Sequence, residues 1–91
     1  MTYIYVYTAD EQKFDRIKKA IDFAKTLKET PVFCVNDLEA IDEVRKGGFK
    51  AMNVDAIEDL FSLTDGSDTF YIITPEDSTY LKASFANVKE I

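Results

Sequence analysis

Residues 2–8 read TYIYVYT, and this stretch decides the fold that the chain is expected to adopt. Ile4 and Val6 alternate with Tyr3, Tyr5 and Tyr7, which is the two-residue period of a β-strand. A strand that is apolar or aromatic on both faces is typical of the centre of a parallel sheet, where helices cover both sides. We therefore expect a central strand here, with three tyrosine rings on one of its faces.

The same organisation recurs along the chain. Further strand-like runs are found at VFCV (32–35), FKAMNV (49–54) and FYII (70–73). Apolar residues with helical spacing follow the run at residues 2–8, VFCV and FKAMNV. VFCV and FYII are continuous apolar runs, as in buried strands, whereas FKAMNV is short and mixed and predicts an edge strand. The predicted order is βαβαβαβ followed by a terminal element, with right-handed crossovers.

Capping residues predict where the helices begin and end. Thr8 and Glu11 fit a capping box before the first helix, which should end before Pro31. Asn36 is expected to cap the second helix, and Gly47-Gly48 to end it. The buried stripes are expected to contain Phe14, Ile17, Ile21, Ala24 and Leu27 in the first helix, and Leu38, Ile41 and Val44 in the second.

The end of the chain allows two interpretations. Thr74 and Pro75 favour a helix start, so residues 75–89 are predicted as a helix. Residues 78, 79 and 84 are poor helix formers, and the alternative is a shorter helix followed by a fifth, edge strand over residues 85–91.

Residues 1–91 are expected to form a single three-layer αβα domain with a mostly parallel, four-stranded sheet. The strand order 3-2-1-4 places the weakest strand at an edge and is favoured over 2-1-3-4. This architecture resembles the Rossmann-like and flavodoxin-like folds, although no motif connects the sequence to a named family.

Composition narrows the classes of function. The net charge is −6, and residues 37–77 alone carry eleven acids and three bases, which disfavours nucleic-acid and anionic-membrane partners. No apolar run is long enough to cross a membrane, and no signal peptide opens the chain. A single cysteine cannot form an internal disulfide, so a cytoplasmic location is expected.

Familiar catalytic constellations are difficult to assemble from this sequence. It contains no histidine, which excludes Ser-His and Cys-His pairs and zinc sites that use histidine. Cys34 lies within an apolar strand and is expected to be a buried, inert thiol. There is no glycine-rich phosphate loop, because the glycine pair follows a helix. We therefore predict no catalytic residues, no metal ligands and no cofactor.

One candidate ligand site is the edge where the parallel strands end. Ligands of open α/β sheets bind beyond the carboxyl ends of the strands, near the point where the strand order reverses. Nucleotide or small-ligand binding at this rim is the alternative function, although helix capping explains the same residue types. The candidates are Thr8, Asp10, Asn36, Asn53, Thr74 and Asp77.

The favoured hypothesis is a small, non-catalytic regulatory domain that binds a protein partner or self-associates. Tyr3, Tyr5 and Tyr7 are the candidate contact residues, because tyrosine is enriched in the energetically dominant parts of interfaces. A third possibility is an acidic protein that mimics nucleic acid toward a basic partner. Its candidate residues are Asp37, Asp42, Glu43, Asp55, Glu58, Asp59, Asp65 and Asp68.

Overall fold

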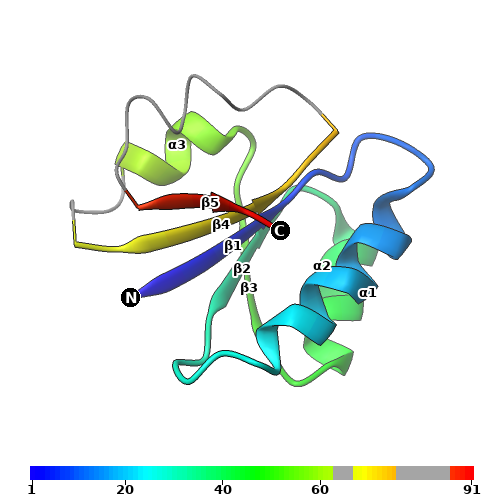
Figure 1. Ribbon diagram of the computed structural model, residues 1–91. Coiled ribbons are helices and arrows are strands. Elements are labelled where there is room, and N and C mark those ends of the chain that lie inside the picture. Colours follow the sequence, from blue (N-terminus) through cyan, green and yellow to red (C-terminus); the bar gives the residue numbers. More distant parts are fainter. Residues whose placement is uncertain (63–66, 76–86) are drawn as a thin grey trace.

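The computed structural model describes residues 1–62, 67–75 and 87–91 and has a parallel sheet at its centre (Figure 1). The strands pair in the order β3-β2-β1-β4-β5, and every pairing is parallel. The strands are β1 (Thr2–Val6), β2 (Val32–Val35), β3 (Lys50–Asn53), β4 (Thr69–Ile73) and β5 (Val88–Glu90). The described helices are α1 (Lys13–Ala24), α2 (Leu38–Lys46) and α3 (Ile57–Ser62).

The Rossmann-like α/β architecture and the favoured strand order 3-2-1-4 are confirmed, and the order 2-1-3-4 is wrong. Beyond β4 the sheet gains β5, so the alternative of a C-terminal edge strand is confirmed for residues 88–90. A continuous helix over residues 75–89 is therefore wrong, because Val88 pairs with Phe70 and its side chain is buried. Residues 76–86, where the preceding part of that helix was expected, lie outside the described residues.

The helices lie on both faces of the sheet (Figure 1). The chain moves in one direction from β1 to β2 to β3, so right-handed crossovers place α1 and α2 on the same face. The return from β3 to β4 runs in the opposite direction across the sheet, and α3 lies on the other face. Strand order thus determines which face each helix covers.

Each face of β1 has its own hydrophobic cluster. Under α1 and α2, the buried residues are Ile4, Val6, Ile17, Ala20, Ala24, Phe33, Val35, Ala40, Val44 and Ile73. On the opposite face they are Cys34, Val54, Phe70, Ile72 and Val88, and the partly buried Tyr3, Tyr5 and Met52 pack against them. The expected division of β1 into an aliphatic face and a tyrosine face is therefore observed.

The two helix starts differ from the predicted capping residues. Helix α1 begins at Lys13, after a turn in which Asp10 accepts a hydrogen bond from the Gln12 backbone N–H at 2.9 Å, so Thr8 does not cap it. The N-cap of α2 is Asp37, which accepts from the Ala40 backbone N–H at 3.1 Å, and not Asn36. At the other end of α2, Gly48 has φ of 89°, which confirms the left-handed stop.

Two apolar side chains that were expected in the core are exposed. Leu38 is 82% exposed, because Ala40 and Val44 face the sheet and Leu38 lies about 200° around the helix from Ala40. Phe14 is 42% exposed and lies in the first turn of α1. Its side chain lines a surface hollow together with Ile21 of α1 and Glu43 of α2.

Candidate functional site at the carboxyl edge of the sheet

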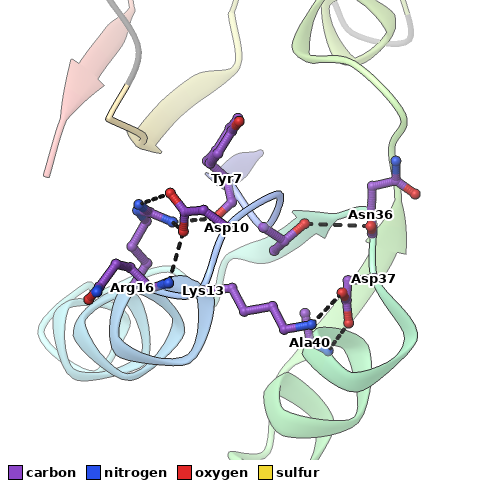
Figure 2. A network of polar contacts seen from close by, with 9 residues as sticks. Tyr7, Asp10, Lys13, Arg16, Asn36, Asp37 and Ala40 are labelled. Atoms are coloured by element: carbon purple, nitrogen blue, oxygen red, sulfur yellow. Dashed lines mark hydrogen bonds and ion pairs between the residues drawn. The ribbon is translucent and has the colours of Figure 1, made fainter.

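The carboxyl ends of β1 and β2 lead into the first turns of α1 and α2, and polar contacts connect these segments (Figure 2). Two ion pairs hold the edge together, one within the segment after β1 and one between the two helices. A weaker contact links the segments that follow β1 and β2, where the Thr8 hydroxyl donates to the Asn36 carbonyl oxygen at 3.5 Å.

Asp10 and Arg16 form a bidentate ion pair. Arg16 Nη1 donates to Asp10 Oδ1 and Arg16 Nη2 donates to Asp10 Oδ2, each at 2.7 Å (Figure 2). Nη1 also donates to the Tyr7 carbonyl oxygen at 3.2 Å, and the guanidinium carbon lies 5.4 Å from the Tyr7 ring centroid. The hydrogen bonds from Arg16 lower the pKa of Asp10, and the same bonds raise the pKa of Arg16. The Arg16 side chain is 13% exposed, so its orientation is well defined.

Lys13 and Asp37 join the starts of the two helices. Lys13 Nζ donates to Asp37 Oδ2 at 2.7 Å, while the other carboxylate oxygen of Asp37 caps α2 (Figure 2). The hydrogen bond from Lys13 lowers the pKa of Asp37, with a further contribution from the Ala40 backbone N–H. The hydrogen bond to Asp37 raises the pKa of Lys13. This pair fixes the relative position of the first turns of α1 and α2.

Arg16 also lines a cavity of about 460 Å³ between α1 and the ends of β4 and β5. This volume lies within the range of about 300–1,000 Å³ that is typical of small-ligand sites. Polar side chains of α1 form one wall, and the apolar Ile73 and Ile91 belong to the lining from the sheet. The cavity lies beside the junction of β1 and β4, where the strand order reverses.

The predicted rim residues do not form a single site. Thr8 and Asn36 are in contact, Asp10 is engaged by Arg16, and Asn53 is exposed at the end of the edge strand β3. Thr74 lines the cavity and is the member of the predicted set that is found there among the described residues. Asp77 lies outside the described residues.

The tyrosines are half-buried. Tyr3 stacks on Phe70 with ring centroids 5.5 Å apart, and its hydroxyl donates to the Met1 sulfur at 3.3 Å. Tyr5 packs against the same cluster, whereas Tyr7 lies beyond the end of β1 and contacts Arg16. Their role in binding a partner stays a prediction.

The chemistry available to the remaining groups is limited. Cys34 is buried, and its burial raises the thiol pKa to about 12, so the thiol is protonated near neutral pH. Across residues 1–62, 67–75 and 87–91, no group of acidic or cysteine side chains is arranged to hold a metal ion. None of the helices in these same ranges is long and apolar enough to cross a membrane.

No protein-family model, curated protein or solved structure matches the chain.

Sequence reasoning missed four residues of this edge: Lys13, Arg16, Phe14 and Leu38. Arg16 follows Asp10 by six residues, a separation that ordinary helix pairing rules do not cover. Lys13 and Asp37 are 24 residues apart and meet through the packing of α1 on α2. The exposure of Leu38 had one signal in the sequence, since Ala40 and Val44 form a second apolar register on the same helix.

Proposed function

We propose that the protein is a small, non-catalytic binding domain whose partner is another protein. The observation that carries this proposal is the exposure of Leu38, at 82%, beside a fixed ion pair. Phe14 directly follows Lys13 in the sequence and Leu38 directly follows Asp37, and Lys13 Nζ lies 5.2 Å from the centroid of the Phe14 ring. We call Lys13, Phe14, Asp37 and Leu38 the helix-start surface.

The geometry of the helix-start surface suits an interface. Isolated exposed apolar residues are normal on protein surfaces and need no explanation. Here the two apolar residues belong to helices whose first turns the ion pair connects at 2.7 Å, so little ordering of the backbone would be required on binding.

The charges around this surface indicate the chemistry of the partner. Glu11, Asp15, Glu39 and Asp42 are exposed on the same two helices or on the segment before α1. A partner with an apolar contact area and a basic rim would be complementary to this arrangement.

The tyrosine face is the competing location for the partner. Tyr3 and Tyr5 support a buried hydrophobic cluster, so a partner there would contact side chains that already stabilise the fold. In the helix-start surface, by contrast, Leu38 is almost entirely exposed, so a partner there would contact a side chain that does not pack in the core. A regulatory role and a cytoplasmic location belong to the same proposal and agree with the acidic, histidine-free sequence.

Nucleic-acid mimicry has less support. Helices α2 and α3 lie on opposite faces of the sheet, so the acids of α2 and those of α3 do not form one continuous surface (Figure 1). Asp37, one of the candidate acids, is engaged by Lys13. Mimicry predicts binding that depends steeply on salt, whereas an apolar contact predicts weak salt dependence.

The test uses purified protein as bait in extracts of the native host, with the double variant Phe14→Ser/Leu38→Ser. The matched control is Thr30→Ala, an exposed, uncharged position on the loop before β2, at the opposite edge of the sheet. We expect a partner that binds the wild type and the control, is lost with the double variant and persists in 0.5 M salt. A partner retained by the folded double variant would contradict the proposal, and so would a partner released by salt alone.

A further inference from the structure

The cavity beside Arg16 has the features of a second, separate site. It lies between α1 and the carboxyl ends of β4 and β5, and its lining does not include Lys13, Phe14, Asp37 or Leu38 of the helix-start surface. One wall is a single face of α1, with Gln12, Arg16 and Lys19 at positions separated by about one turn. Thr74 faces this wall from the end of β4.

Among the described residues, the hydrogen bonds of Arg16 leave one edge of its guanidinium group available. A guanidinium group carries five N–H donors. Two are directed from Nη1, to Asp10 Oδ1 and the Tyr7 carbonyl oxygen, and one from Nη2 to Asp10 Oδ2. The two that remain belong to Nε and Nη2, which lie on the same side of the planar group and point in parallel directions. Two parallel N–H donors match the two oxygens of a carboxylate.

The surroundings favour a ligand with one negative charge and an apolar body. Asp10 already balances the charge of Arg16, and Asp15 and Glu90 also line the cavity, so the remaining cation of the lining is Lys19. A highly charged phosphate ligand would meet these acids, and no glycine-rich loop is present to surround it. Ile73 and Ile91, which belong to or pack on the core under α1, provide apolar contact.

We propose that this cavity binds a small molecule with an apolar body and a single carboxylate, and that the carboxylate is received by the free Nε–Nη2 edge of Arg16 with Lys19 beside it. Asp10 acts as a positioning residue, because its bidentate contact directs the free edge of the guanidinium group. The ligand is thus recognised by the fork, meaning the two parallel N–H donors of Arg16, and by apolar contact. The net charge of the cavity lining contributes little.

The first experiment is an NMR titration of the full chain with 4-methylpentanoate, with 4-methylpentanamide as the neutral probe of the same shape. We expect saturable shifts of the Arg16, Lys19 and Thr74 amide signals at roughly millimolar concentrations, which a ligand of this size can reach. The neutral amide should bind at least about tenfold more weakly, because charge-assisted hydrogen bonds are about twice as strong as neutral ones. No saturation at up to 50 mM carboxylate, equal binding of the amide, or tighter binding of inorganic phosphate would each overturn the proposal.

Three variants locate the site. Lys19→Gln should weaken binding a few-fold, while Lys18→Gln should leave it unchanged, because Lys18 lines a different hollow on the other side of α1. Arg16→Lys keeps the charge and removes the fork, so binding should fall about tenfold. Equal losses for Lys18→Gln and Lys19→Gln would place the binding elsewhere, and undiminished binding by folded Arg16→Lys would exclude the fork.

Discussion

The two faces of β1 are built differently. On the face under α1 and α2, Ile4 and Val6 are 0% and 1% exposed and belong to a cluster of mainly aliphatic and small residues that also contains Phe33. On the opposite face, Tyr3 and Tyr5 are only partly buried and pack at the border of a smaller buried cluster. One strand of five residues therefore separates a core from a more open aromatic layer.

This difference shows how a short α/β chain divides its apolar residues. Helices α1 and α2 have 12 and 9 residues, and they bury one face of the sheet through Ile17 and through small alanine and valine side chains that allow close approach. Helix α3, on the opposite face, has 6 residues. Among the described residues, this face has the shorter helical cover, and tyrosine suits it because its ring is apolar while its hydroxyl can remain hydrated.

The largest effect is expected from Phe33→Ala, on the face under α1 and α2. Phe33 is fully buried, with its ring 5.2 Å from that of Phe49, and its removal leaves a cavity. We expect the free energy of unfolding to fall by about 3–5 kcal/mol, as measured by denaturant titration. A loss below about 1 kcal/mol would show that this face is not the main core.

A smaller effect is expected from Tyr3→Ala, on the tyrosine face. The variant removes the stacking of Tyr3 on Phe70 but only part of a buried surface, so the expected loss is about 1–3 kcal/mol. Tyr3→Phe keeps the ring and should cost less than Tyr3→Ala in the same denaturant titration. If Tyr3→Ala lowered the free energy of unfolding as much as Phe33→Ala, the two faces would contribute equally to stability and the proposed difference between them would be wrong.

The ion pairs at the carboxyl edge predict a dependence of stability on acid pH. The folded-state pKa values of Asp10 and Asp37 lie below their ordinary values, so the stabilisation is present above the unfolded pKa of about 4. It is lost as the pH falls through the lower folded-state values, when the folded carboxylates take up protons. Denaturant titrations at several values between pH 7 and pH 3 measure how steeply the free energy of unfolding changes with pH.

Asp37 has two roles, as the partner of Lys13 and as the N-cap of α2, and the variant Asp37→Asn distinguishes them in that experiment. Asparagine is a good N-cap but cannot pair with Lys13 as an anion, so the variant should be helical and less sensitive to acid than the wild type. An unchanged slope would mean that the Lys13–Asp37 pair does not stabilise the fold.

The smallest effect is expected from Leu38→Ser, in the helix-start surface. Since the side chain is 82% exposed, the free energy of unfolding should change by less than about 0.5 kcal/mol. Val44→Ala on the same helix is the control, because Val44 is fully buried and its truncation should destabilise measurably in thermal melts. Destabilisation by Leu38→Ser similar to that of Val44→Ala would show that Leu38 packs against the fold.

Much of the fold could be predicted because it depends on local patterns. The alternation in residues 2–8 and the apolar run of residues 32–35 indicate buried strands. The run around Lys50 has fewer apolar residues and indicates an edge strand. Those three assignments suffice to favour 3-2-1-4 over 2-1-3-4. The end of the chain was harder, because Val88 has helical spacing from Leu81 and Phe85 while its own backbone pairs with β4.

The candidate site was predicted much less well. The rim at the carboxyl ends of the strands stays a prediction, and among the described residues Thr74 alone of the predicted set lines the cavity. Asp10 was expected to face a ligand and instead holds Arg16. Polar residues at the ends of strands indicate where a ligand site can lie. Their hydrogen bonds and ion pairs within the protein determine which of these side chains could contact a ligand.

By itself, the sequence determined the alternation of strands and helices, the central position of β1 and its two chemically different faces. These features follow from the period of apolar residues along the chain, which is a local property. Only the tertiary structure decided that Leu38 faces solvent, that Lys13 meets Asp37 and that Arg16 lines a cavity. Each of these depends on the rotation of a helix over the sheet and on contacts between segments far apart in the chain.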